Sequence, residues 1–468
     1  GTFLSWKARI DLSFRCGAKM RKIMRLSGLF VVGLFVSGLS LLGQQTYQLK
    51  AADYVVQTDP EGFQNISIED FFSYGIPGYP DLPSRIYLIA VPSDAELSTL
   101  VLRTTEIAGR SLGSFRIREL PALETWAEGR RTVSDKADCY TKNDYFPEKA
   151  VELLGSCRMR KWKIARVKYT PFRYNPVTRE LVYVPEVEVR LSYARRSGQA
   201  PDLLELADGA MNERAARKLW NFDEARTWYT TSAPLPRASA VHDFVIITTT
   251  AIQSASTKLA DFVNFLIDQG HNPLVVTETS YGALTGQSPN GTAEKIRQWL
   301  INNYLTYGIE YVLLIGNPDP SSGNIPMKMC WPRYSYSTYR ESPTDYFYAD
   351  LTGNWDLDGD GYFGEYPDDD GTGGVDFMNE VYVGRIPVYS GVGSLDSVLQ
   401  KTVTYESSAD LAWRKSALLP MSFSDSTTDG AYLSEAMIAN YLTPAGFSDW
   451  TMYMQGSLCP PNANSSFA

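Results

Sequence analysis

Three aspartates at alternate positions form the motif with the most specific chemistry in this sequence. Asp356, Asp358 and Asp360 are followed by Gly361, a residue that permits the tight turn such a loop needs. Carboxylate oxygens at this spacing are typical ligands of Ca²⁺, which prefers a cage of oxygen atoms. The motif therefore predicts a structural calcium loop. Because Asp and Gly also favour ordinary turns, a solvated acidic turn is the alternative.

The loop has no glutamate at the position that closes an EF-hand. Pro367 occupies the twelfth position, so the motif is not a true EF-hand. The closing carboxylate would have to come from Glu365 or from one of three nearby aspartates: Asp368, Asp369 and Asp370.

Side chains for nucleophilic catalysis are scarce in this chain. The two histidines, His242 and His271, lie at the edges of predicted elements, where a surface or capping role is the simpler explanation. None of the five cysteines stands beside a histidine in sequence, and no metalloprotease, serine-hydrolase or nucleotide-binding motif is present. We therefore assign no catalytic residue within residues 1–468. A disulfide between Cys139 and Cys157 is left open.

The N-terminal region has the pattern of a secretion signal. A charged stretch from Met20 precedes the apolar run from Leu26 to Leu42. This run of 17 residues contains glycines and serines and is short for a membrane span of about 20 residues. We therefore expect a signal peptide over residues 20–44, a secreted protein and no stable membrane span. Residues 1–19 are interpreted as upstream sequence that does not belong to the protein.

Composition limits the number of domains and the kinds of partner. With 468 residues and 44% hydrophobic content, the chain exceeds the roughly 250–300 residues of a single core, so we expect at least two domains. The formal net charge of −9, with scattered basic residues, argues against nucleic-acid binding.

Two different patterns of side chains follow the signal region. Over residues 45–194, short runs such as 85–91 and 186–193 alternate apolar and polar side chains, which predicts an antiparallel, β-rich domain buried on one face. Residues 195–240 predict an exposed linker with one helix over 203–220.

From residue 241 to residue 468, predicted strands alternate with predicted helices. This order indicates an α/β domain with a parallel sheet. The predicted strands are 244–249, 273–277, 311–316, 380–386 and 416–421, and the predicted helices are 254–269, 292–305, 395–406 and 429–442.

Several segments, in order, resemble the gingipain family of clan CD cysteine peptidases. The most specific is Asn-Glu-Val-Tyr-Val-Gly-Arg-Ile-Pro at 379–387, and the others are residues 158–181, 244–248, 311–317 and 342–348. The resemblance implies a β-rich propeptide that occupies the active site until it is removed. It also implies that an α/β, caspase-like catalytic domain follows, incomplete in this sequence.

The function implied by the resemblance is that of a secreted cysteine endopeptidase precursor, extracellular or on a bacterial cell surface. Its partners would be protein or peptide substrates and its own propeptide. In such relatives the catalytic His and Cys follow later strands, in motifs absent here, so we expect this sequence to be truncated before them. The alternative is a non-catalytic, calcium-binding surface or adhesion protein on the same scaffold.

The resemblance also suggests binding residues. A structural Ca²⁺ would be held at Asn317, Asp376 and Glu380, where Asn317 replaces the usual Asp and removes one charge. An acidic residue that selects Arg or Lys substrates is expected early in the helix near residue 429. Ala431 stands at the aligned position and Asp429 lies two residues away. The sequence therefore leaves specificity for Arg or Lys substrates open, with Asp429 as the candidate residue.

Overall fold

The computed structural model describes residues 42–75, 78–120, 138–196, 202–231, 241–332, 341–366, 368–422, 429–454 and 465–467. Residues 1–19 and most of the predicted signal peptide lie outside these ranges. Its last three residues, 42–44, begin a strand that pairs with residues 192–194. Within the described ranges, no helix is long and apolar enough to cross a membrane.

The N-terminal domain is built from antiparallel β-sheets, as the alternating pattern predicts. In β12 (Glu186–Ala194) the side chains of Val187, Val189, Leu191 and Tyr193 are buried, while the residues between them are not. One face of the sheet therefore covers a core, because successive side chains in a strand point to opposite faces. The first sheet has the order β1-β12-β6, with β1 at Leu42–Lys50 and β6 at Val101–Glu106.

The remaining strands of this domain complete the enclosure of the same core. A four-stranded sheet has the order β4-β5-β9-β8, so β8 is an edge strand. Its members are β4 (Phe72–Ser73), β5 (Pro83–Val91), β9 (Trp162–Tyr169) and β8 (Val151–Met159). The smaller sheets comprise β2 (Tyr54–Thr58), β3 (Gln64–Ile68), β7 (Arg110–Ser114), β10 (Phe172–Asn175) and β11 (Glu180–Tyr183), and 3₁₀ turns lie at η1 (Leu97–Thr99) and η3 (Asp138–Tyr140).

The segment predicted as an exposed linker with one helix over 203–220 contains several short helices and is partly buried over residues 202–231. Asn221 donates to and accepts from the backbone of Ala90 in β5, and Tyr229 packs on Trp162 with ring centroids 4.6 Å apart. The prediction of exposure is wrong here because apolar side chains of these short helices cover the outer face of β9. The elements are α1 (Leu203–Ala207), α2 (Asn212–Lys218), α3 (Phe222–Ala225) and η4 (Arg226–Tyr229).

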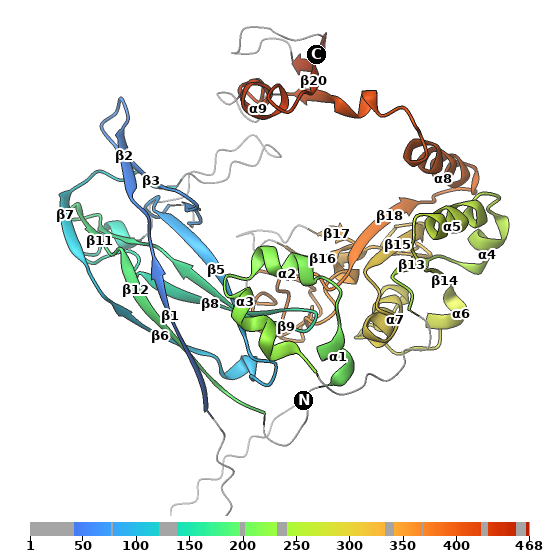
Figure 1. The fold of residues 1–468 in the computed structure, drawn as a ribbon, viewed down its shortest axis with the longest axis horizontal. Coiled ribbons are helices and arrows are strands. Elements are labelled where there is room, and N and C mark those ends of the chain that lie inside the picture. The colour runs from blue at the N-terminus through green and yellow to red at the C-terminus, as the bar shows by residue number, and fades with distance from the viewer. Residues whose placement is uncertain are drawn as a thin grey trace, which may run out of the picture. The chain divides into compact units, whose positions relative to one another are not determined.

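The second domain contains the predicted parallel sheet, with strand order β14-β13-β15-β18. Side chains of the central strands alternate between two cores: Val245 and Ile247 enter one, and Ile246 enters the other. Helices therefore cover both faces, as a parallel sheet requires, with α7 on one face and α5 and α8 on the other (Figure 1). The strands are β13 (Phe244–Ile247), β14 (Pro273–Val276), β15 (Tyr311–Gly316) and β18 (Tyr382–Pro387).

The helices of this sheet are α4 (Thr250–Ala255), α5 (Leu259–Asp268), α6 (Glu278–Tyr281), α7 (Thr292–Tyr307) and α8 (Gly393–Glu406). Helices α7 and α8 match the predicted helices 292–305 and 395–406, the predicted helix 254–269 is divided into α4 and α5, and α6 was not predicted. Helix α7 ends at Gly308, which has a φ of +68° and takes the left-handed conformation that suits glycine.

Smaller elements follow in the same domain. The hairpin β16 (Lys328–Cys330) and β17 (Ser342–Thr344) precedes η5 (Tyr346–Tyr348). A second parallel sheet consists of β19 (Ser416–Met421), β20 (Ser448–Met454) and β21 (Ser465–Phe467). The predicted helix 429–442 is α9 (Ala431–Met437) followed by the π-helical turn η7 (Ile438–Leu442), and η6 (Ala412–Lys415) precedes β19.

Trp162 should contribute strongly to the stability of the N-terminal domain, because its side chain is only 2% exposed beneath the helical segment. Replacing it with Ala is expected to lower the free energy of unfolding by about 3–5 kcal/mol, measured by denaturant titration. Leu42→Ala is the control, since Leu42 is 79% exposed and should change the value by less than about 0.5 kcal/mol. Equal effects of the two substitutions would contradict the packing of residues 202–231 on β9.

Candidate functional site

Both histidines lie where a parallel α/β sheet does not place catalytic groups. His242 precedes β13, and His271 precedes β14 and contacts Asp243 through Nδ1 at 2.6 Å. Ligands of such sheets bind beyond the carboxyl ends of the strands, whereas both histidines lie at the amino ends. Their contacts support a structural role at the sheet edge.

The three described cysteines are buried or partly buried free thiols. Burial raises the pKa of Cys330 to about 11, and its Sγ donates to the Ser342 carbonyl at 3.1 Å. Burial also raises the pKa of the Cys139 and Cys157 thiols, and no disulfide joins them. None of the three is poised as a thiolate nucleophile, because a reactive thiol needs a lowered pKa.

The acidic loop brings its carboxylates together, as the spacing predicts. Single oxygens of Asp358, Asp360 and Glu365 lie within 4.8 Å of one another, and Asp356, Asp358 and Asp369 form an overlapping group. The backbone N–H of Gly361 donates to Asp356 at 3.0 Å, which closes the turn. Of the four candidates for the closing carboxylate, Glu365 and Asp369 are thus the two that join the loop aspartates.

The buried carboxylate of Glu365 has an oxygen atom without a hydrogen-bond partner in the described part of the chain. The side chain is 3% exposed, and its Oε2 has no hydrogen-bond partner among the described residues. Burial, together with the nearby Asp360, Asp368 and Asp358, raises the pKa of Glu365 to about 7. A buried carboxylate in this setting is costly unless a cation or a proton neutralises it.

A second acidic cluster forms before β18, although not with the composition that resemblance suggested. Asp376 and Glu380 are buried near Asp350. Burial and mutual repulsion raise the pKa of Asp376 to about 7 and also raise that of Glu380 well above its usual value. Within the described part of the chain, Asp350 Oδ2 has no hydrogen-bond partner. Asn317, which was expected here, instead accepts a hydrogen bond from the Asp319 N–H at 3.0 Å.

Sequence reasoning missed Asp350. The residue follows the aromatic segment Tyr346-Phe-Tyr, and a carboxylate directly after such a buried turn is a weak signal that could have identified it.

The same region of the α/β domain receives the unpaired edge of β8. Three alternate backbone N–H groups point outward from this edge and donate to side-chain oxygens of segment 372–380. Ser156 donates to Thr372 Oγ1 at 3.0 Å, Arg158 to Asp376 Oδ2 at 2.7 Å and Arg160 to Glu380 Oε1 at 3.3 Å. We call this contact the edge latch. It satisfies polar groups that burial would otherwise leave without partners.

Arg160 anchors the edge latch. Its side chain is 0% exposed and donates to the carbonyls of Ile309 at 2.6 Å and Glu380 at 3.0 Å. The guanidinium also pairs with Asp208, through Nε at 2.5 Å and a second nitrogen at 3.0 Å. One side chain therefore joins the helical segment of the N-terminal domain to the α/β domain.

Asp429, considered for substrate binding, is buried at the start of α9. Its Oδ1 accepts a hydrogen bond from the Ala431 N–H at 3.0 Å. This contact holds the first turn of the short helix, so the carboxylate has a structural role in the described arrangement.

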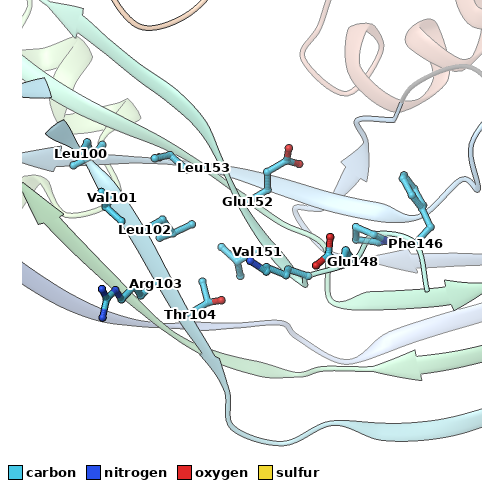
Figure 2. Close-up of a pocket in the computed structure, with 12 residues that line it drawn as sticks. Leu100, Val101, Leu102, Arg103, Thr104, Phe146, Glu148, Val151, Glu152 and Leu153 are labelled. Atoms are coloured by element: carbon cyan, nitrogen blue, oxygen red, sulfur yellow. The ribbon is translucent and has the colours of Figure 1, made fainter. Parts of the chain in front are cut away.

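A large cavity among the described residues does not coincide with any of these groups. It has a volume of about 910 Å³ and lies within the N-terminal domain. Figure 2 shows its lining side chains, which come from β6 and the preceding Leu100 on one side and from residues 146–153 on the other. Its charged members, such as Arg103 and Glu152, form no constellation with evident chemistry.

Loss of the Arg160 side-chain charge should weaken the edge latch. Arg160→Met leaves Asp208 buried without its partner, so we expect the free energy of unfolding to fall by about 3–5 kcal/mol. Denaturant titration measures the change, and hydrogen exchange of segment 372–380 reports whether it is local. Arg217→Met is the matched control, because Arg217 is an exposed arginine of the same domain. If both variants had the same stability and exchange, the assigned role of Arg160 would be wrong.

Comparison with known proteins agrees with this two-domain organisation. Residues 237–464 match the family model of peptidase family C25, and residues 44–227 match the model of the C25 propeptide. No curated protein matches the chain.

Two solved structures from Porphyromonas gingivalis are similar to parts of the chain. The complex of RgpB pro- and mature domains is 17% identical, covers 38% of this chain and 93% of that chain, and has a TM-score of 0.30. A structure of gingipain K, described as an insight into its zymogenic latency, is 22% identical, covers 33% of this chain and 88% of that chain, and has a TM-score of 0.26. The family assignment rests on the two domain models. Because they match in the order propeptide then peptidase and together span most of the chain, the protein belongs to peptidase family C25 as a gingipain-type precursor.

Proposed function

We propose that the chain is part of a secreted cysteine endopeptidase precursor whose catalytic Cys and His are not among residues 1–468. The observation that carries the second half of this proposal is the position of the histidines: both described ones lie at the amino ends of strands. The membership in family C25 supports the peptidase chemistry. The charged stretch and apolar run over residues 20–42 support secretion.

The reaction would be cleavage of peptide bonds in proteins or peptides. A cysteine thiolate attacks the carbonyl carbon, and an imidazolium protonates the departing amine. In this proposal the described α/β domain supplies the scaffold for that pair.

The edge latch gives the propeptide a defined hold on the peptidase domain. Arg160 and the β8 edge bind segment 372–380 through main-chain and side-chain groups, so release of the propeptide has to break several hydrogen bonds and to uncover the buried Arg160 guanidinium. We propose that this contact keeps the precursor assembled until the chain between the domains is cut. Arg195-Arg196 is a candidate site for that cut, although Arg195 pairs with Asp94 here.

Calcium is the cofactor that the acidic groups fit. We propose a structural Ca²⁺ held by Asp356, Asp358 and Asp360, with Glu365 closing the loop and Asp369 supporting it. The orphaned Glu365 oxygen supports this assignment, because a cation would supply the partner that the described protein lacks.

A second calcium position is proposed at Asp376 and Glu380, with Asp350 in place of Asn317 as the third carboxylate. The unpartnered Asp350 oxygen supports this position.

Residues 1–468 alone should not hydrolyse peptide substrates. We expect no hydrolysis above the rate in buffer alone. The described cysteines are buried or partly buried thiols, and the contacts of both histidines support a structural role. The complete reading frame should contain a Cys and a His after further strands, and replacing that Cys with Ala should abolish activity of the processed protein. Hydrolysis by residues 1–468 that disappears in Cys330→Ala would contradict the proposal. A complete frame that lacks the pair would favour a non-catalytic calcium-binding surface protein.

Without divalent cations, the chain should become less stable as the pH rises. The folded-state pKa values of Asp376 and Glu365 are raised to about 7, above the value of about 4 for an exposed carboxyl group. The folded state therefore binds these protons more tightly, and the resulting stability, present below about pH 4, is lost as the pH rises through about 7. We expect the Tm in chelator to be lower at about pH 8 than at about pH 5.

Added Ca²⁺ should restore much of the lost stability at the higher pH, as thermal unfolding would show. The double variant Asp358→Asn/Asp360→Asn should reduce this gain, whereas Asp268→Asn, at the end of α5, is the matched control. If calcium left the Tm unchanged, the loop at 356–365 would be an ordinary acidic turn.

A further inference from the structure

A pocket beside the acidic loop combines aromatic walls with unpaired polar atoms. It has a volume of about 240 Å³ and lies among β16–β17, η5 and the loop that precedes β18. Its walls include four aromatic side chains: Tyr346, Trp355, Tyr366 and Phe377. The rings of Tyr346 and Phe377 are stacked, with centroids 6.1 Å apart.

Three lining residues of this pocket carry polar atoms without partners, in addition to Glu365. They are the hydroxyl of Tyr346, the indole N–H of Trp355 and Oδ1 of Asp370, all buried and without a hydrogen bond among the described residues. A buried polar group without a partner lowers the stability of the fold. Such groups are uncommon in folded proteins, so their concentration at one pocket indicates a ligand that would pair with them.

The charges around the pocket indicate the sign of that ligand. Glu365, Asp369 and Asp370 line it, and no lining residue is cationic. Asp370 belongs to neither group of clustered carboxylates, so its carboxylate remains available when calcium fills the loop. The pocket therefore favours a cation with apolar surface.

The unpaired atoms distinguish a peptide from a metal ion. A metal ion would pair with the carboxylates but would leave the Trp355 N–H without an acceptor, because an indole only donates. A peptide supplies both a cationic side chain and backbone carbonyl acceptors. The volume is below the roughly 300–1,000 Å³ of small-molecule pockets, which suits one side chain.

We propose that this pocket binds the arginine side chain of an extended peptide. The guanidinium donates to Asp370 and stacks on the aromatic walls, which favours arginine over lysine because its planar group stacks well on rings. A carbonyl of the same peptide accepts from Trp355. This binding does not require peptidase activity.

Calorimetric titration of residues 1–468, with calcium present, tests the proposal. The probe is the peptide acetyl-Ala-Gly-Arg-Gly-Ala-amide, and the control peptide has citrulline, which keeps the shape and removes the charge. We expect the arginine peptide to bind at least about tenfold more tightly, the difference made by one hydrogen bond to a charged group. Equal affinity of the two peptides would overturn the proposal.

Variants of the protein locate the binding. Asp370→Asn and Phe377→Ala should each weaken the arginine peptide, and Phe377 is 64% exposed, so its loss should leave the fold intact. Asp268→Asn is the matched control, because Asp268 is an exposed aspartate of the same domain that does not line the pocket. An equal loss in Asp268→Asn would show only a general charge effect and would contradict the site.

The chain's own arginines at 333 and 340 are the remaining alternative occupants. If the peptide bound only to the double variant Arg333→Gln/Arg340→Gln, the pocket would belong to one of them, and the proposal of an external peptide would be wrong.

Discussion

The need to satisfy buried polar groups governs the contact between the two domains. A strand at the edge of a sheet presents N–H groups that must find acceptors, and β8 finds them in the side chains of Thr372, Asp376 and Glu380. The buried carboxylates in turn require donors or cations. Each domain thus supplies what the other lacks, and the Arg160 guanidinium, paired with Asp208 inside the N-terminal domain, donates to two carbonyls of the α/β domain.

This arrangement links latency to the acidic character of the peptidase domain. The segment that receives the propeptide lies directly after the acidic loop, and Asp369 accepts from the Leu357 and Glu365 N–H groups while its own carbonyl accepts from Val375. A cation that orders the loop would therefore also order the start of the receiving segment. Calcium binding and the hold of the propeptide would then share one structural element.

Much of the fold follows from patterns that are local in sequence. The alternation in 186–193 predicted β12, and the change to strands and helices after residue 241 predicted the parallel sheet with its helical layers. The acidic spacing predicted which aspartates come together. These features depend on side-chain periodicity and turn chemistry, which a short segment carries by itself. The scarcity of histidine likewise followed from the sequence.

Only the tertiary structure decided the contacts between distant segments. The sequence could not show that residues 202–231 cover β9, because short helices with few apolar residues resemble a linker until a partner surface exists. It could not place Asp350 beside Asp376, and it could not decide which of the candidate carboxylates would join the loop, since burial is a property of the whole fold. The physical reason is that packing buries these carboxylates beside one another. Their burial and mutual repulsion raise their pKa values and favour a bound cation.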